Sequence, residues 1–270
     1  MVHKDITIII LLFNTPSNVL KNLRNYKNFK VAILDQSNDF DSKKKIKKFL
    51  PNVIYYKVSE NNIGFSNGVN FLVNKVNTKY FLCTQPDVYI SVKSILELKK
   101  VFLNNNDAII SVPKFKKIKT KKKLYGFKKI QNFVGSIFLC EKRKFKKIKM
   151  FDRNFFFYWE DVDLSKRIEK SRYQIYLSHK SIASHQSSKS TKKDLISTYI
   201  RISNFKFGEY LYQYKNDRLK LVKILREPFI NCFLFFLSIV ILKKKNAIDH
   251  LFTLIGLLKF YKYVFLKKLK

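Results

Sequence analysis

The segment 150–168 holds the densest group of residues that could do chemistry. Five aromatic residues at 155–159 stand directly before Glu160, Asp161 and Asp163. A carboxylate at the end of an apolar run is costly to remove from water, so such a group suggests that the charge is used. A carboxylate shielded in this way is suited to accept the proton of an attacking hydroxyl.

The same segment also fits an interpretation without chemistry. Asp161, Leu164 and Ile168 recur on one helical face, and acids in a first helical turn interact favourably with the helix dipole. Asp163 and Arg167 stand four positions apart, which is the spacing of a simple ion pair on a helix. The residues alone therefore leave a catalytic helix and a capped amphipathic helix as open alternatives.

Short strands and helices alternate through the N-terminal half and would position these residues. Apolar runs predict strands at 6–13, 30–34, 53–58, 80–84 and 108–112, with helices at 16–25, 67–76 and 91–103. Ser94 and Glu97 have the spacing of a capping box. Strand and helix in alternation indicate an α/β fold with a mostly parallel sheet. Ligands of such sheets bind beyond the carboxyl ends of the strands, where Asn14, Asp35 and the segment after Thr84 lie.

The C-terminal residues differ in character from the rest of the chain. Residues 229–242 are apolar except for Asn231 and Ser238, three lysines follow, and residues 247–266 are again mostly apolar. The first run is shorter than the roughly 20 residues that span a bilayer, and its basic flanks are typical of interfacial helices. We therefore expect a domain at 1–210 and a helical, membrane-associating extension at 211–270. Two core helices packed on the domain are the alternative.

The charge and the cysteines limit the class of protein. Fifty-five Lys and Arg against 19 Asp and Glu give a net charge of +36, which favours a polyanionic partner, although a compositional bias towards Lys, Asn, Ile and Phe accounts for part of it. Cys83, Cys140 and Cys232 lack metal-site or disulfide-framework spacing, which fits a reducing compartment. The apolar run at 6–13 is too short for a membrane span and lacks a signal-peptide cleavage site.

Five segments, in order, resemble family-2 glycosyltransferases with the GT-A fold, in particular the rhamnosyltransferase-like members. Residues 150–168 resemble the family's FxEDxDL region. Residues 61–70 resemble NxGFxxGxN, residues 85–88 resemble NPDx, residues 135–139 resemble a small-residue acceptor-side segment, and residues 185–190 resemble HxxxxS. One such motif is weak evidence, but five in the family's order, spread from about residue 6 to residue 190, are specific.

The resemblance implies a GT-A fold with a Rossmann-like, mostly parallel sheet. It also implies the type of reaction that the protein catalyses. The reaction is an inverting transfer of a sugar, with rhamnose as a candidate, from a nucleotide-diphosphate sugar donor to a cell-envelope or lipid-linked glycan. Asp161 matches the family's catalytic base, with Glu160 as the competing carboxylate. Asp87 and His185 match contacts to Mg2+ or Mn2+, and Asp35 matches the residue that reads the base or ribose.

The resemblance also implies a set of donor contacts: Asn14, Asp35, Asn62, Gly64, Asn70 and Pro86. The sequence departs from the family's pattern at two places around the nucleotide. Gln85 stands where the family usually has Asn, and residues 36–38 read Gln-Ser-Asn where the family usually has Asn-x-Ser. His179 competes with His185 as a contact to the diphosphate. These departures bear on the identity of the donor more than on the fold.

We expect a cytoplasmic protein, peripheral on the inner face of the cell membrane, that binds an anionic membrane surface and no nucleic acid. Two other functions stay open. A basic nucleic-acid-binding protein would explain the charge, but the aromatic residues gather in apolar runs instead of alternating with lysines on a strand. A catalytically inactive, glycan-binding relative would explain the altered motifs.

Overall fold

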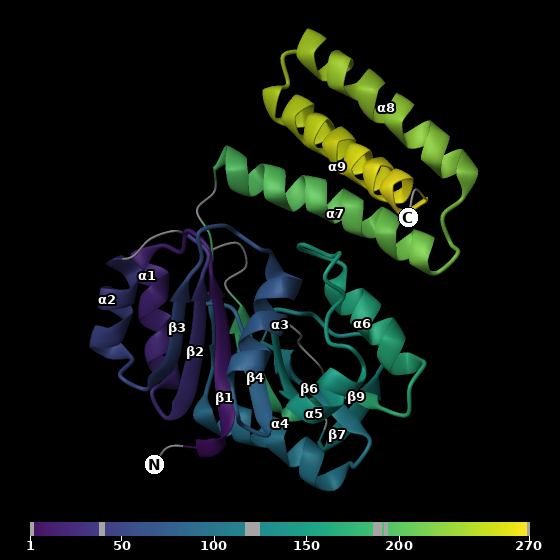
Figure 1. Ribbon diagram of the computed structural model, residues 1–270. Helices are drawn as coiled ribbons and strands as arrows, with labels where there is room; N and C mark the ends of the chain where they lie inside the picture. Colours follow the sequence, from purple (N-terminus) through teal and green to yellow (C-terminus); the bar gives the residue numbers. More distant parts are fainter. Residues whose placement is uncertain (1–2, 38–40, 117–124, 186–190, 192–193, 269–270) are drawn as a thin grey trace. The chain divides into compact units, whose positions relative to one another are not determined.

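The computed structural model of the chain describes residues 3–37, 41–116, 125–185, 191 and 194–268 (Figure 1). The chain divides into two compact units, of which the first comprises residues 1–154 and 161–192 and the second comprises residues 155–160 and 193–270. Residue 210, the boundary that the sequence predicts, lies within the helix α7 (Leu195–Lys215). That helix belongs as a whole to the second unit.

The first unit contains a mixed sheet. Its strands are β1 (His3–Leu12), β2 (Phe29–Asp35), β3 (Val53–Val58), β4 (Tyr80–Thr84), β5 (Val88–Ile90), β6 (Ala108–Phe115), β7 (Phe127–Ile130), β8 (Ile137–Glu141) and β9 (Gln174–His185). The order across the sheet is β3-β2-β1-β4-β8-β6-β9-β5, and β7 pairs with β9 outside this path. The neighbours from β3 to β4 are parallel, as is β6 with β9, whereas β8, β5 and β7 pair antiparallel with their neighbours.

The inner parallel strands β1, β2 and β4 form because they are apolar on both faces. Strands covered by helices on both sides become near-continuous runs of Ile, Leu and Val in the sequence. Ile8, Ile10 and Ile33 are completely buried in this core, as are Val31 and Leu82. The predicted strands at 6–13, 30–34, 53–58, 80–84 and 108–112 are therefore confirmed, with ends that shift by a few residues.

The helices of the first unit connect these strands. They are α1 (Ser17–Leu20), the 3-10 helix η1 (Lys21–Tyr26), α2 (Asp41–Phe49), α3 (Phe65–Lys75), α4 (Val92–Asn104), α5 (Lys142–Lys147) and α6 (Glu160–Glu169). Gly68 lies inside α3, where an added Cβ would meet the side chain of Leu11 at 2.9 Å. The pair Asn67-Gly68 thus belongs to a helix packed closely on β1, in agreement with the helix predicted over 67–76.

Two local predictions need correction. The helix predicted over 16–25 is a single α-turn that continues as a 3-10 helix. The capping box predicted at Ser94 and Glu97 is wrong, because Ser91 caps α4 and accepts a hydrogen bond from the Ser94 amide. Glu97 instead pairs with Lys100 at 2.8 Å. The spacing rule matched Ser94, whereas the helix begins three residues earlier, directly after Ser91.

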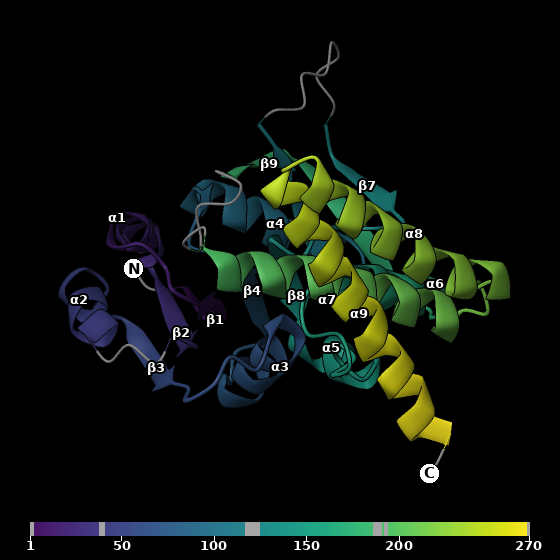
Figure 2. The ribbon, with the colours of Figure 1, turned by 90° about the horizontal axis from the view of Figure 1, so that it is seen from above.

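The second unit is built from three long helices and residues 155–160. After α7 come α8 (Leu221–Val240) and α9 (Lys244–Lys268), and α9 packs against both α7 and α8 (Figures 1 and 2). Tyr210, Leu257 and Phe260 form the buried centre of this unit. Both predicted C-terminal apolar runs are helices. Within the described part of the chain, no helix combines the length and the apolarity needed to cross a membrane.

Candidate functional site

The strand register gathers the predicted site residues of the first unit at one edge of the sheet. Leu12 of β1 pairs with Asp35 of β2, and Ile10 of β1 pairs with Thr84 of β4. The antiparallel β8 begins at the same edge, because Ile137 pairs with Thr84. The loops that leave β1, β2 and β4 and the loop that enters β8 therefore meet there, which is where α/β sheets bind ligands.

Asp35 is buried and held in place by its neighbours. Its carboxylate accepts hydrogen bonds from the Ser37 amide at 3.0 Å and from the Tyr56 hydroxyl at 2.9 Å. Ser37 also accepts a hydrogen bond from the Asn14 amide at 2.7 Å, and Asn14 has a left-handed backbone with φ 47°. Asn14 and Asp35, predicted together from the ends of two strands, are thus linked through one serine.

Two of these supporting residues were not predicted as part of the site. Ser37 follows Asp35 at the spacing of an Asx turn, in which a carboxylate accepts from the amide two residues later, so the sequence contained a signal for it. Tyr56 is 21 residues from Asp35, and only the parallel pairing of β2 with β3 brings the two together. No local pattern identifies such a contact.

The loop before α3 is shaped by side-chain hydrogen bonds to its own backbone. The Asn62 side chain accepts from the Gly64 amide at 2.9 Å, and Gln36 accepts from the Ile63 amide, also at 2.9 Å. Gly64 has φ 83°, a conformation that favours glycine, and it stands at the N-cap of α3. Gln36, one of the departures from the family pattern, therefore connects the loop after β2 to the loop before α3.

Asn70 has a different position from the other predicted donor contacts. It is buried in α3, where its amide nitrogen donates to the Phe151 carbonyl at 2.9 Å and its oxygen accepts from the Phe151 amide at 3.2 Å. Both ends of the side chain therefore bind one backbone unit shortly before α6. In this structure Asn70 anchors α3 to that segment, and the donor contact that the resemblance implies stays a prediction.

Asp87 and His185 lie side by side. Asp87 directly precedes β5, whose first residue, Val88, pairs with His185 at the end of β9. The Asp87 Oδ1 and His185 Nε2 atoms are 3.4 Å apart, and the Asp87 carboxylate is almost completely buried. Pro86, just before them, accepts a hydrogen bond from the Asn22 side chain at 3.3 Å through its carbonyl. This contact fixes the turn that presents Asp87.

The alternative histidine is remote from Asp87. His179 lies in the same strand β9, six positions before His185, and its amide donates to the Gly126 carbonyl. At about 3.3 Å per residue of a strand, six positions correspond to roughly 20 Å. The structure therefore places His185, and not His179, beside Asp87.

The chemistry of this pair suits a divalent metal. A carboxylate oxygen and an imidazole nitrogen are donors that Mn2+ accepts, and Mg2+ commonly takes one or two protein carboxylates with substrate phosphates and water. Among the described residues, no three His, Cys, Asp or Glu side chains come together to hold an ion. A metal at Asp87 and His185 would thus take its remaining ligands from a diphosphate and water.

Asp161 is held at the same edge of the sheet by backbone amides. Its Oδ2 atom accepts from the Gly135 amide at 2.9 Å, and its Oδ1 atom accepts from the Val162 amide at 2.9 Å. Burial raises the pKa of the Asp161 carboxyl above its usual value, and these hydrogen bonds oppose the rise in part. Because Gly135 stands two residues before β8, this carboxylate lies at the sheet edge described above.

The two acids nearest to Asp161 in α6, Glu160 and Asp163, have different surroundings. Asp163 is buried and forms the predicted ion pair with Arg167 at 2.8 Å. Arg167 also donates to the carbonyls of Ile148 and Met150, so this pair fastens α6 to the preceding segment. Glu160 is buried and belongs to the part of the chain that folds with the second unit. Asp161, by contrast, accepts hydrogen bonds from the backbone amides of Gly135 and Val162.

Three solved structures share the fold at low sequence identity. A mannosyltransferase, PcManGT from Pyrobaculum calidifontis in complex with GDP-Man and Mn2+, has a TM-score of 0.58 at 10% identity, over 95% of this chain and 87% of that chain. S. aureus TarS 1-349 has a TM-score of 0.53 at 13% identity, over 93% and 90%. GalNAc-T7 with UDP, GalNAc and Mn2+ has a TM-score of 0.57 at 13% identity, over 76% of this chain and 47% of that chain, so this chain spans about half its length.

These similarities show the GT-A fold that the sequence predicts. Among curated proteins, no sequence matches this chain. The family model described as Glycosyl transferase family 2 matches residues 7–164, which include the second half of β1, the loops after β1, β2 and β4, and the beginning of α6. The matched region covers more than half of the 270 residues. The chain belongs to glycosyltransferase family 2.

Proposed function

We propose that the protein is an inverting glycosyltransferase with Asp161 as its catalytic base. The acceptor oxygen attacks the anomeric carbon, the bond from that carbon to the nucleoside diphosphate breaks, and the hydroxyl proton passes to the Asp161 carboxylate. The single observation that carries this proposal is the environment of Asp161. A partly buried carboxylate with a raised pKa, oriented by the Gly135 amide, is a stronger base than a solvated one.

The donor is a nucleotide-diphosphate sugar bound at the same edge of the sheet. Asp35, steadied by Tyr56 and Ser37, can accept a hydrogen bond from a ribose hydroxyl or a base. Asn14, Asn62, Gly64 and Pro86 would shape the surrounding loops. PcManGT was solved with GDP-Man and GalNAc-T7 with UDP, and rhamnose is the sugar that the resemblance suggests for this chain.

Asp87 and His185 would hold a Mg2+ or Mn2+ ion. Such an ion neutralises the charge that develops on a leaving diphosphate. The support is the 3.4 Å approach of a buried carboxylate to an imidazole at the end of β9. The similar structures PcManGT and GalNAc-T7 contain Mn2+.

The acceptor is a cell-envelope or lipid-linked glycan, reached at the inner face of the cell membrane. The support is the net charge of +36, which favours an anionic surface, together with the basic residues around the C-terminal apolar helices. On this proposal the protein is cytoplasmic and peripheral on the membrane.

Asp161→Asn tests the base. The variant keeps the shape of the side chain and removes its basicity, so sugar transfer should fall by about 100- to 10,000-fold while donor affinity stays nearly unchanged. A thermal-shift panel of nucleoside-diphosphate sugars with Mn2+ first identifies the donor, because a ligand of the native state raises the melting temperature. Transfer and donor binding are then measured on the same preparations.

Glu160→Gln is the matched control, because it makes the same chemical change one residue earlier. Its side chain leaves the helix about 100° away from that of Asp161, and transfer should fall much less. Transfer that survives Asp161→Asn and is lost in Glu160→Gln would move the base to Glu160. A wild-type protein that neither binds nor slowly hydrolyses any nucleotide sugar would favour an inactive relative or a nucleic-acid-binding protein.

A further inference from the structure

The outward face of helix α8 is almost wholly apolar, whereas four of its eight wholly or partly buried positions are polar. All of its residues are described, and four polar positions at helical spacing are wholly or partly buried: Lys223, Glu227, Asn231 and Ser238. A surface helix of a water-soluble protein normally shows the reverse, with its apolar stripe towards the core. The inversion suggests that the outward face does not simply meet water.

The inward stripe is polar because it joins a hydrogen-bonded network. Lys206 of α7 lies 2.8 Å from Glu209 and 3.0 Å from Glu227, and Lys223 pairs with both glutamates. Asn231 lies within hydrogen-bonding distance of His250 on α9, at 3.2 Å. These contacts fix the rotation of α8 about its own axis, so its outward face is determined by the packing of the unit.

The outward face is a continuous apolar surface. Phe229, Phe233 and Phe236 are exposed to 76%, 66% and 60%, and Arg226 is the one charged residue among the exposed positions of α8. The other exposed positions are Leu221, Val222, Leu225, Ile230, Cys232, Leu237, Ile239 and Val240. An apolar patch of this extent marks an interaction surface.

We propose that this outward face of α8 is the surface by which the protein docks on an anionic membrane. The helix would lie in the plane of the headgroup region, over a length of roughly 30 Å for its 20 residues, with the phenylalanine side chains among the acyl chains. The proposal deepens the membrane location given above and rests on it. It does not depend on which residue is the catalytic base.

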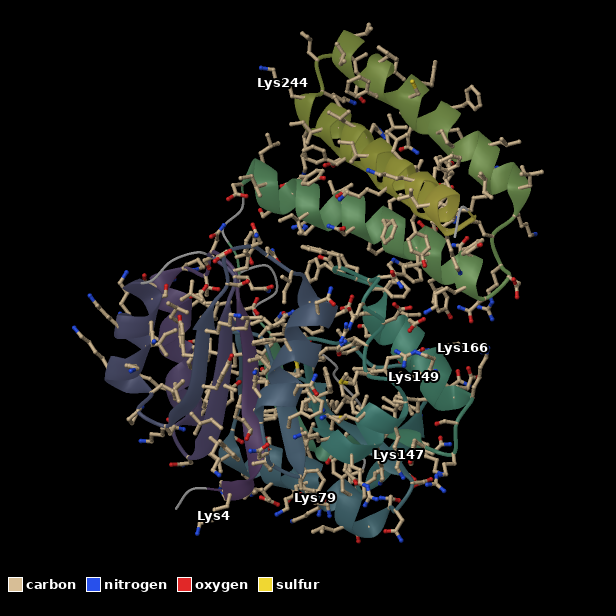
Figure 3. All side chains as sticks on the ribbon, viewed as in Figure 1. Lys4, Lys79, Lys147, Lys149, Lys166 and Lys244 are labelled. Carbon is tan, nitrogen blue, oxygen red and sulfur yellow. The ribbon has the colours of Figure 1, made fainter. Side chains whose placement is uncertain are left out.

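Charge selects an anionic membrane over a second copy of the chain. Basic side chains stand near both ends of the apolar face: Lys220 and Arg226 near its beginning, and beyond its end the exposed Lys243, with Lys244 and Lys245 in the first turn of α9. Figure 3 labels Lys244 at the beginning of α9. Anionic headgroups attract Lys and Arg side chains that lie near the membrane surface. If two copies of the chain paired through this face, each would carry a net charge of +36, and their mutual repulsion would disfavour the pair.

The docking surface is tested by replacing Phe229, Phe233 and Phe236 together with serine in the full-length chain. Flotation is measured with vesicles of neutral phosphatidylcholine and with vesicles that also contain an anionic phosphatidylglycerol. We expect the wild type to float with the anionic vesicles, and the triple variant to lose at least about tenfold in partitioning, since each exposed phenylalanine contributes to burial in the bilayer. Its melting temperature should not fall, because the three side chains are largely exposed.

The matched control is Leu195→Ser with Ile196→Ser, which removes two exposed apolar side chains from α7 of the same unit. This variant should float like the wild type. Equal flotation of wild type and triple variant, or a wild type that ignores both kinds of vesicle, would overturn the proposal. A further result would also overturn the proposal: the wild type sediments as a dimer, the triple variant sediments as a monomer, and neither binds vesicles. Donor hydrolysis, measured in parallel without vesicles, separates failure of docking from failure of the proposed enzyme.

Discussion

Two aspartates of α6 stand two positions apart and have opposite surroundings. Asp163 forms an ion pair with Arg167. The Asp161 carboxylate instead accepts hydrogen bonds from two backbone amides, and among the described residues no Lys or Arg forms an ion pair with it. Burial without a cationic partner makes a carboxylate a stronger base. At the scale of single residues, this difference is the reason for preferring Asp161 as the base.

The raised pKa of Asp161 predicts a pH dependence of stability. The folded state binds this proton more tightly than the unfolded chain, so the contribution of Asp161 to stability is lost as pH rises from the usual value of 3.8 through the raised pKa. Relative to the wild type, Asp161→Asn should therefore gain stability over this interval. Urea unfolding of both proteins across the acid range measures the difference. A difference independent of pH would mean that the carboxyl is not shifted in the folded protein.

The proposed metal site predicts a selective loss of donor binding. Asp87→Ala removes the buried carboxylate beside His185, so the increase in donor affinity caused by Mn2+ should disappear. Isothermal titration with and without Mn2+ measures this increase. Asp107→Ala is the control, because it removes a carboxylate of the same unit that pairs with Lys129 at the surface. The same metal effect in Asp87→Ala and in the wild type would rule out Asp87 as a ligand.

At the scale of elements, α8 contains a proline whose defect is repaired by another helix. Pro228 has no amide hydrogen, so the Ile224 carbonyl four residues earlier loses its partner within the helix. The Tyr261 hydroxyl of α9 donates to that carbonyl at 2.7 Å. Burial raises the pKa of Tyr261, so this hydroxyl keeps its proton and acts as a donor. The contact ties α8 to α9 at one defined position.

This repair predicts a coupling between Tyr261 and Pro228. Tyr261→Phe should lower the free energy of unfolding by about 1–3 kcal/mol, because it leaves a carbonyl without its donor. In a Pro228→Ala background the helix can make its own hydrogen bond, and the same substitution should cost clearly less. The four proteins of this double-mutant cycle are compared by denaturant unfolding. Equal costs in both backgrounds would show that the hydroxyl does not replace the missing amide.

At the scale of the whole molecule, the positive charge is distributed and not gathered in one tail. Figure 3 labels the exposed residues Lys4 in β1, Lys79 just before β4, and Lys147 and Lys149 at and after the end of α5, all in the first unit. A distributed charge attracts an anionic surface over a long range, while specific contacts come from a smaller region. In this protein we assign those contacts to α8.

The combination of a distributed positive charge with an apolar docking face on α8 predicts that membrane binding depends only partly on salt. Between about 0.1 M and about 1 M NaCl the screening length falls from roughly 10 Å to roughly 3 Å, which removes most of the long-range attraction. Flotation of the wild type with anionic vesicles should weaken and then level off at a remainder supplied by the phenylalanines. The triple serine variant should lose even this remainder. Complete loss of wild-type binding at high salt would show that charge alone carries it.

Deleting the C-terminal residues is a poor test of this surface. Leu257 and Phe260 of α9 pack against Tyr210 of α7 in the centre of the second unit. A chain without α9 would expose the apolar face of α7, and its changed behaviour would reflect unfolding as much as lost docking. Substitutions on the outward face of α8 avoid this difficulty.

The sequence alone determined the parallel strands, the helix at Glu160 and the family. Strands buried on both faces must be apolar throughout, so their positions can be read from continuous apolar runs. Each motif at the sheet edge is a short run of consecutive residues, so it can be recognised in the sequence without knowledge of the fold. The pair of Asp163 and Arg167 was also predictable, because its spacing is fixed by the helix itself.

Only the tertiary structure decided the surroundings of these residues. The pairing of β5 with β9 places His185, and not His179, beside Asp87, and the pairing of β2 with β3 brings Tyr56 to Asp35. Asn70 binds Phe151, which is 81 residues away. The sequence of α8 shows that two faces differ in polarity, but not which of them meets the protein. That choice depends on partners from α7 and α9, and periodicity within one helix carries no information about its neighbours.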